Sequence, residues 1–162
     1  MNERASNLNH EKIRELAKAL DDAIEIRKTE EVISYFSETC EVELLGIKLN
    51  GKEGLGKAIN WIFSYLKEMI LVPITIMIQG NTFFEEFTVK TRVKGKDIQV
   101  KQAEVLVYDD EYKVKSLRLY FDRLELAAAY TSNPVEKMMV DRLKKASLKG
   151  LLYLRDVEEN NR

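Results

Sequence analysis

The feature that most constrains this chain is a run of four strand-like segments between residues 72 and 121. They are VPITIMIQ, TFFEEFTVKTRVK, DIQVKQAEVLVY and KVKSLRLYF, and only GN, KGK and DDE join them. Connectors this short link neighbouring antiparallel strands, whereas parallel strands need a crossover of about a dozen residues or more. We therefore predict an antiparallel meander over this region.

Helical periodicity precedes the strands. Apolar residues recur with helical spacing over residues 8–24, and shorter helices are predicted for residues 29–37 and 55–69. Between the last two lie a strand-like segment at residues 40–47 and the turn-like NGKEG. Helices followed by a run of strands are typical of an α+β fold, in which a curved antiparallel sheet carries helices on its concave side.

A last helix is predicted over residues 134–154, because Asn133, Pro134 and Glu136 suit its N-cap, N1 and N3 positions. It has one apolar and one basic side, which fits a surface helix docked on its own domain. The alternatives are a helix that binds an anionic membrane and one that binds a partner. A polar tail, residues 155–162, follows. With 162 residues and no long linker, we expect a single domain.

Charge and cysteine content exclude several classes of protein. The chain has 26 Lys and Arg against 27 Asp and Glu, so we expect no nucleic-acid partner. Cys40 is the only cysteine and His10 the only histidine, so a metal site would need carboxylates alone. We expect no metal, no cofactor and a cytoplasmic location. The longest uncharged run in the most apolar window, residues 69–81, is shorter than the ~20 residues of a membrane span.

One motif suggests nucleotide binding. GKEGLGKA, residues 51–58, matches the phosphate-binding pattern GxxxxGK[ST] at both glycines and at the lysine. However, Ala58 replaces the hydroxyl residue that binds magnesium, and the meander lacks the parallel strands of such folds. We favour a glycine-rich turn that leads into a helix.

Alternation within the strands assigns side chains to faces. The inward positions are Phe83, Glu85, Phe87, Val89, Thr91 and Val93, then Val100, Gln102, Glu104, Leu106 and Tyr108, then Leu117, Leu119 and Phe121. Val105, Val107 and Tyr120 face outward and predict a homodimer through the sheet. Asp122 also points outward, and DRLE fits a helix-capping box with Glu125 at N3. A catalytic carboxylate is the alternative interpretation of Asp122.

The order of these segments resembles a known superfamily. A first helix, then TEEVISYFSETCEVE, GKEGLGKAI, the meander and the ending LRLYFD resemble nuclear transport factor 2-like proteins over residues 9–130. The SnoaL-like branch is the most similar, alongside ketosteroid isomerase and limonene epoxide hydrolase. The resemblance implies a cone-shaped α+β fold around a deep apolar pocket, commonly dimeric. It implies a cofactor-independent isomerase, cyclase or hydrolase if the protein is an enzyme.

The resemblance also indicates which positions correspond to the relatives' catalytic residues. The isomerase's carboxylate base falls at Leu44 and its oxyanion-binding tyrosine at Leu20, so both positions are apolar here. Its protonated aspartic acid falls at Glu104. The hydrolase's arginine and its two aspartates fall at Gln102, Glu104 and Leu119. The chain therefore resembles the scaffold but neither mechanism.

Glu104 is thus the candidate catalytic residue, with Asp122 as a secondary candidate. A carboxyl among apolar side chains loses hydration, so its pKa rises and it can act as a general acid or base. The alternative is that Glu104 only bonds to polar neighbours or reaches the pocket mouth. The candidate ligand-binding residues are Trp61, Gln102, Leu106, Tyr108, Leu119, Phe121, Leu44 and Leu20.

Three functions follow from this interpretation. The first is the binding of a small, largely apolar molecule, and the second is a lyase, isomerase or cyclase that uses Glu104 for proton transfer. The third is a homodimeric interaction module with a filled pocket, which a cavity below ~300 Å³ would favour. A second polar group within reach of Glu104 would favour catalysis over simple binding.

Overall fold

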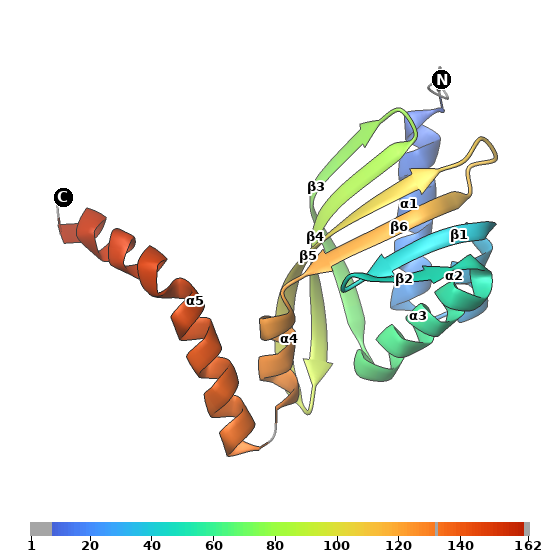
Figure 1. The fold of residues 1–162 in the computed structure, drawn as a ribbon. Helices are drawn as coiled ribbons and strands as arrows, with labels where there is room; N and C mark the ends of the chain where they lie inside the picture. Colours follow the sequence, from blue (N-terminus) through green and yellow to red (C-terminus); the bar gives the residue numbers. More distant parts are fainter. Residues whose placement is uncertain (1–7, 132, 161–162) are drawn as a thin grey trace. The chain divides into compact units, whose positions relative to one another are not determined.

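The computed structural model describes residues 8–131 and 133–160. The chain divides into two compact units, Met1–Phe121 and Asp122–Arg162. Within the described residues, the first unit carries three helices and a six-stranded sheet, and the second carries two helices (Figure 1). The single domain expected from the chain length stays a prediction.

The helices of the first unit are α1 (His10–Glu25), α2 (Thr29–Ser34) and α3 (Gly51–Tyr65). The Asn9 side chain caps α1 by accepting hydrogen bonds from the backbone N–H groups of Glu11 and Lys12. Helix α2 is shorter than predicted because the chain enters a strand at Phe36.

Helix α3 begins earlier than expected, since the segment predicted as a turn already forms its first turn. Gly51 starts the helix with φ +66°, and a Cβ at Gly54 would lie 3.0 Å from Leu49. The glycines of GKEGLGKA therefore allow a tight helix start and close packing, and the segment is helical rather than a phosphate-binding loop. At the other end of α3, the Arg27 guanidinium donates to the carbonyl oxygens of Phe63, Leu66 and Lys67.

The sheet has the strand order β2-β1-β6-β5-β4-β3. Its strands are β1 (Phe36–Leu44), β2 (Ile47–Asn50), β3 (Met69–Gln79), β4 (Thr82–Val93), β5 (Lys96–Tyr108) and β6 (Val114–Phe121). Strands β3 to β6 form the predicted antiparallel meander. The expectation of a wholly antiparallel sheet is wrong in one place, because β1 pairs with β6 in parallel. The long stretch of chain between these two strands supplies the crossover that parallel pairing needs.

The inward face matches the predicted alternation. All the inward positions assigned to β4 and β5 are buried, whereas those of β6 are half-buried. Helix α1 packs against β3 and β4 and helix α3 against β1, so both lie on the sheet (Figure 1). The buried side of α1 consists of Ile13, Ala17, Leu20 and Ala23. The core therefore lies between these helices and one face of the sheet.

The second unit contains α4 (Arg123–Tyr130) and α5 (Pro134–Asn160). The Asp122 carboxylate caps α4 by accepting from the Leu124 N–H at 2.8 Å, which confirms the predicted cap. Glu125 pairs with Lys144 at 2.9 Å. Helix α5 continues past its expected end at residue 154, because the tail up to Asn160 has no glycine or proline to stop it. Residues 161 and 162 of the expected tail lie outside the described residues.

No helix in the described part of the chain is both long and apolar enough to cross a membrane.

Candidate functional site

Three carboxyl side chains from separate elements converge on the inward face of the sheet. Glu85 on β4 and Glu104 on β5 are directly paired across the two strands. Asp21 comes from α1, one helical turn after the buried Ala17. One carboxylate oxygen from each of the three lies within 4.8 Å of the other two. We call Asp21, Glu85 and Glu104 the carboxyl cluster.

The surroundings of the carboxyl cluster are largely apolar. Glu85 is only 2% exposed and Glu104 8%, whereas Asp21 is half-buried. The next inward positions on β4 are Phe83 and Phe87, and Leu106 follows Glu104 on β5. Leu119 on β6 lies opposite Glu104. Low solvation disfavours the charged form of every carboxyl here.

The pKa values of all three acids are raised. Burial raises the pKa of Glu104 to about 8, and the charge of Glu85 adds to this effect. Burial raises the pKa of Asp21 to about 9, with contributions from the charges of Glu104 and Glu85. The pKa of Glu85 is also raised by burial, although a hydrogen bond from Asp21 opposes the rise. At neutral pH the cluster therefore holds protons and exchanges them near physiological pH.

Tyr108 adds a fourth polar group to this region. It lies on the same face of β5 as Glu104 and is 1% exposed. Its hydroxyl has no hydrogen-bond partner among the described residues. Burial raises its pKa, and the charges of Glu104 and Asp21 act in the same direction, so the hydroxyl is within electrostatic range of both. Buried hydroxyls are normally paired, so an unpaired one requires an explanation.

The spacing of the carboxylate oxygens allows one cation to contact all three acids. Calcium and magnesium ions generally take about six or more oxygen ligands. Of the adjacent inward side chains, Phe83, Phe87 and Leu106 supply none and Gln102 offers one amide oxygen. A metal ion would therefore depend on water for the rest of its coordination.

The structure places the remaining predicted site residues as follows. Leu20, Leu44, Gln102 and Leu106 are buried, while Leu119 and Phe121 are half-buried at inward positions of β6. Trp61 is 42% exposed on α3 and lies against Tyr65, with ring centroids 5.1 Å apart. Their roles in ligand binding stay predictions. Asp122 is exposed and acts as a cap, and a catalytic role for it stays a prediction.

Sequence reasoning identified Glu104 but missed its two partners. Glu85 was assigned to the inward face, and an acid between the inward Phe83 and Phe87 already indicates a candidate functional residue. Asp21 follows Ala17 by four residues and therefore continues the apolar side of α1, which marks it as an acid facing the core.

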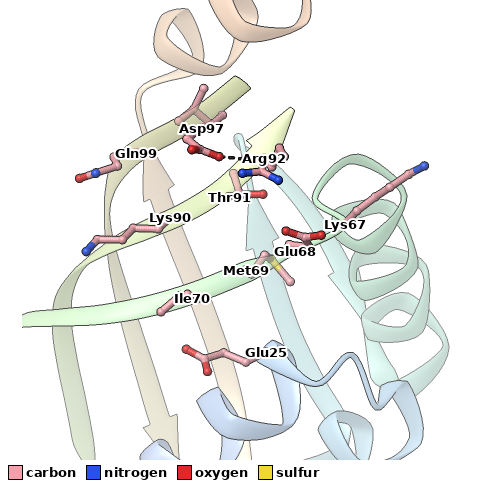
Figure 2. Close-up of a pocket in the computed structure, with 11 residues that line it drawn as sticks. Glu25, Lys67, Glu68, Met69, Ile70, Lys90, Thr91, Arg92, Asp97 and Gln99 are labelled. Carbon is pink, nitrogen blue, oxygen red and sulfur yellow. Dashed lines mark hydrogen bonds and ion pairs between the residues drawn. The ribbon is translucent and has the colours of Figure 1, made fainter. Parts of the chain in front are cut away.

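A cleft of about 470 Å³ lies elsewhere on the first unit (Figure 2). Its walls are the end of α1, the connection between α3 and β3, the start of β3 and the facing parts of β4 and β5. They carry Glu25, Lys67, Glu68, Met69, Ile70, Lys90, Thr91, Arg92, Asp97, Ile98 and Gln99. Glu25 accepts from the Leu71 N–H at 2.6 Å, and Arg92 pairs with Asp97 at 2.8 Å. This cleft is largely charged and includes none of the predicted site residues, so it differs from the apolar pocket that the resemblance implies.

No family model and no curated protein matches the chain. Solved structures do match. A hypothetical protein with a ketosteroid isomerase-like fold from Catenulispora acidiphila, in complex with trimethylamine, is 15% identical with a TM-score of 0.64. The match covers 71% of this chain and 91% of that protein. A nuclear transport factor 2-like protein of unknown function from Burkholderia pseudomallei is 16% identical, with a TM-score of 0.67 and coverages of 74% and 98%.

A candidate SnoaL-like polyketide cyclase from Shewanella denitrificans is 12% identical, with a TM-score of 0.65. It covers 75% of this chain and 98% of its own length. At these identities the likeness concerns the fold. The chain has the nuclear transport factor 2-like α+β cone fold that its sequence resembles.

Proposed function

We propose that the protein binds a small, largely apolar molecule within the cone, with the carboxyl cluster as the polar end of the site. The observation that supports this proposal is the convergence of two buried acids and the half-buried Asp21, within electrostatic range of the unpaired Tyr108 hydroxyl. Burying ionisable groups without a countercharge lowers stability, so such a cluster is costly as a structural element. Groups with strongly raised pKa values concentrate at functional sites.

The same cluster supports a second candidate function, an enzyme of the lyase, isomerase or cyclase type. Asp21 and Glu85 are the neighbouring polar groups that catalysis by Glu104 would need. With pKa values of about 8 and 9, Glu104 and Asp21 are mainly protonated at neutral pH and can donate protons, and each can accept a proton again after it has donated its own. Neighbouring acids in different protonation states allow a proton to be removed and returned within one site.

Two of the structural relatives support a small-molecule role. The Catenulispora protein is in complex with trimethylamine, and the Shewanella protein is a candidate polyketide cyclase. Both share the fold of this chain, which supports the use of the cone for small organic molecules here.

Native mass spectrometry of the purified protein tests the proposal. We expect a retained organic compound in the wild type and in Glu86→Gln, a matched control on the opposite face of β4. Glu104→Gln should lose most of this compound because the polar contact is altered. Equal retention by Glu104→Gln and the wild type would contradict the role of the cluster. If a reaction is found, unchanged turnover in Glu104→Gln would exclude the enzyme candidate.

We also propose that the protein forms a homodimer through the outward face of the sheet. Tyr120 is 51% exposed, and the outward Ile70 and Met77 are exposed as well. Val105 and Val107 extend this apolar face on β5. Sedimentation should show a dimer that Tyr120→Glu weakens, since a charge would be buried at the interface. A monomeric wild type would contradict this proposal.

A further inference from the structure

We propose that the molecule bound at the carboxyl cluster is a protonated amine, whose ammonium group is held by Asp21, Glu85 and Glu104. This inference rests on the proposed function and specifies the chemical class of its ligand. It follows from the geometry of the three acids, from the lack of a countercharge around them and from the unpaired Tyr108 hydroxyl.

The geometry suits an ammonium group. A primary ammonium has three N–H donors, and charge-assisted hydrogen bonds place each acceptor oxygen about 2.8 Å from the nitrogen. Three such acceptors in a tetrahedral arrangement lie about 4.6 Å apart. In the structure, one oxygen from each of the three carboxyls lies within 4.8 Å of the other two, so no pair is too far apart to share a nitrogen. The ammonium would take the place of the proton in the hydrogen bond between Asp21 and Glu85. Because they come from α1, β4 and β5, the acceptors approach one point from three directions.

The electrostatics also favour a cation. None of the ion pairs found among the described residues includes a member of the carboxyl cluster. The buried and half-buried inward positions described for β4, β5 and β6 contain no lysine, arginine or histidine, and the buried side of α1 has none either. Without a ligand, protons limit the negative charge of the cluster. An ammonium group can replace these protons and supply the missing positive charge.

Tyr108 provides the independent sign of a ligand. Its hydroxyl is buried and unpaired among the described residues, although polar neighbours act on it electrostatically. A neutral phenol oxygen can accept a hydrogen bond from a polar group of the ligand. Phe83 and Phe87 flank Glu85 on the same face of β4, and aromatic faces attract organic cations. Asp21 is half-buried, so its side of the cluster gives a route to solvent.

These surroundings favour an organic cation over a metal ion. A calcium or magnesium ion needs about six or more oxygen ligands, and among the adjacent inward side chains only Gln102 offers one, since Phe83, Phe87 and Leu106 are apolar. An ammonium group needs three acceptors, and its hydrocarbon part can pack against Phe83, Phe87 and Leu106. The site is therefore expected to take an amine with an apolar body.

Calorimetry with butylamine as the probe tests the inference. We expect saturable binding at pH 7 and binding of butan-1-ol, the matched neutral compound, at least about tenfold weaker. Because the amine displaces protons from the cluster, the heat of binding should change between buffers with different ionisation enthalpies. Glu85→Gln and Glu104→Gln should each weaken butylamine binding by about tenfold or more, and the control Glu86→Gln should not.

Tyr108→Phe serves as a second variant, because it removes one oxygen while keeping the shape of the core. Butylamine gives its three N–H donors to the acids, so this variant is tested with 4-aminobutan-1-ol, whose hydroxyl can donate to the Tyr108 oxygen. We expect weaker binding of this compound with an unchanged circular dichroism spectrum, and unchanged affinity would refute the role of the hydroxyl. Failure of butylamine to bind the wild type would overturn the inference. So would equal binding of butan-1-ol, or Mn²⁺ binding that depends on the three acids and excludes butylamine. If butan-1-ol binds as tightly as butylamine and its binding depends on Glu104, the amine is refuted but the proposed function stands. If neither compound binds and the purified protein retains no molecule, the proposed function is refuted as well.

Discussion

The carboxyl cluster predicts that the protein loses stability as the pH rises from about 5 to 9. In the folded protein the pKa of Glu104 is about 8 and that of Asp21 about 9, against ordinary values of 4.5 and 3.8. Over this range the folded state binds more protons than the unfolded chain. Linkage then requires the free energy of unfolding to fall with increasing pH, until the folded acids ionise.

The size of the effect follows from the same pKa values. Each proton retained only by the folded state costs about 1.4 kcal/mol per pH unit. For Glu104, the interval from 4.5 to pH 7 gives a loss of about 3 kcal/mol. Asp21 contributes with the same sign. This loss is large against a typical total stability of about 5–15 kcal/mol.

Glu104→Gln should remove this loss because an amide does not ionise. Allowing about 1 kcal/mol for imperfect hydrogen bonding of the amide, the variant should be about 2 kcal/mol more stable than the wild type at pH 7. The gain should grow towards pH 8, vanish near pH 5 and turn into a deficit of about 1 kcal/mol below about pH 4, since the wild-type carboxyl is then protonated in both states.

Urea unfolding followed by circular dichroism at constant ionic strength, between pH 5 and pH 9, measures these changes. Glu86→Gln, on the opposite face of β4, should follow the wild type. The exposed Glu53 and Asp97 have lowered pKa values because of Lys57 and Arg92, so they affect stability only at more acidic pH. A wild-type stability that is flat or rises over this range would refute the reasoning, as would a Glu104→Gln variant without any gain at pH 7.

Two further substitutions test local contacts. Gly54→Ala would place a methyl group 3.0 Å from Leu49, so we expect urea unfolding to show a loss of about 1–3 kcal/mol, and an unchanged midpoint would contradict the close packing of α3. Asp122→Ala removes the acceptor for the Leu124 N–H and should weaken the start of α4 by about 1 kcal/mol in hydrogen exchange. It should leave ligand retention unchanged, and a loss of retention would instead make Asp122 a site residue.

The meander could be predicted because its signals are local. The loop between β4 and β5 consists of Lys94 and Gly95, both with positive φ, as in the two-residue turns that suit twisted hairpins. The pairing of β1 with β6 could not be predicted in this way, because it joins segments far apart in the sequence and no turn fixes it. The start of α3 was misplaced since a glycine-rich stretch is typical of a turn, and the close approach of Gly54 to Leu49 is a tertiary feature.

The site shows the same difference between features that local sequence signals predict and features that depend on tertiary packing. Alternation placed Glu85 and Glu104 on one face, and the Lys94–Gly95 turn fixes their pairing once its length is known. The position of Asp21 depends on how α1 packs across the sheet, which no strand pattern contains. The unpaired hydroxyl of Tyr108 is likewise visible only when the whole core is assembled.

The pH dependence and the proposed ligand involve the same protons, and this link separates a structural cluster from a functional one. If Asp21, Glu85 and Glu104 serve only the fold, an amine leaves the slope of stability against pH unchanged. If an ammonium group replaces their protons, ligand binding to the folded state should add stability that increases with pH, until the amine itself deprotonates. Saturating butylamine should then flatten the wild-type slope between pH 5 and pH 9 but have little effect on Glu104→Gln, which has already lost part of that slope. If butylamine does not alter the slope of wild-type stability against pH, the cluster binds protons in the folded state but does not bind an amine.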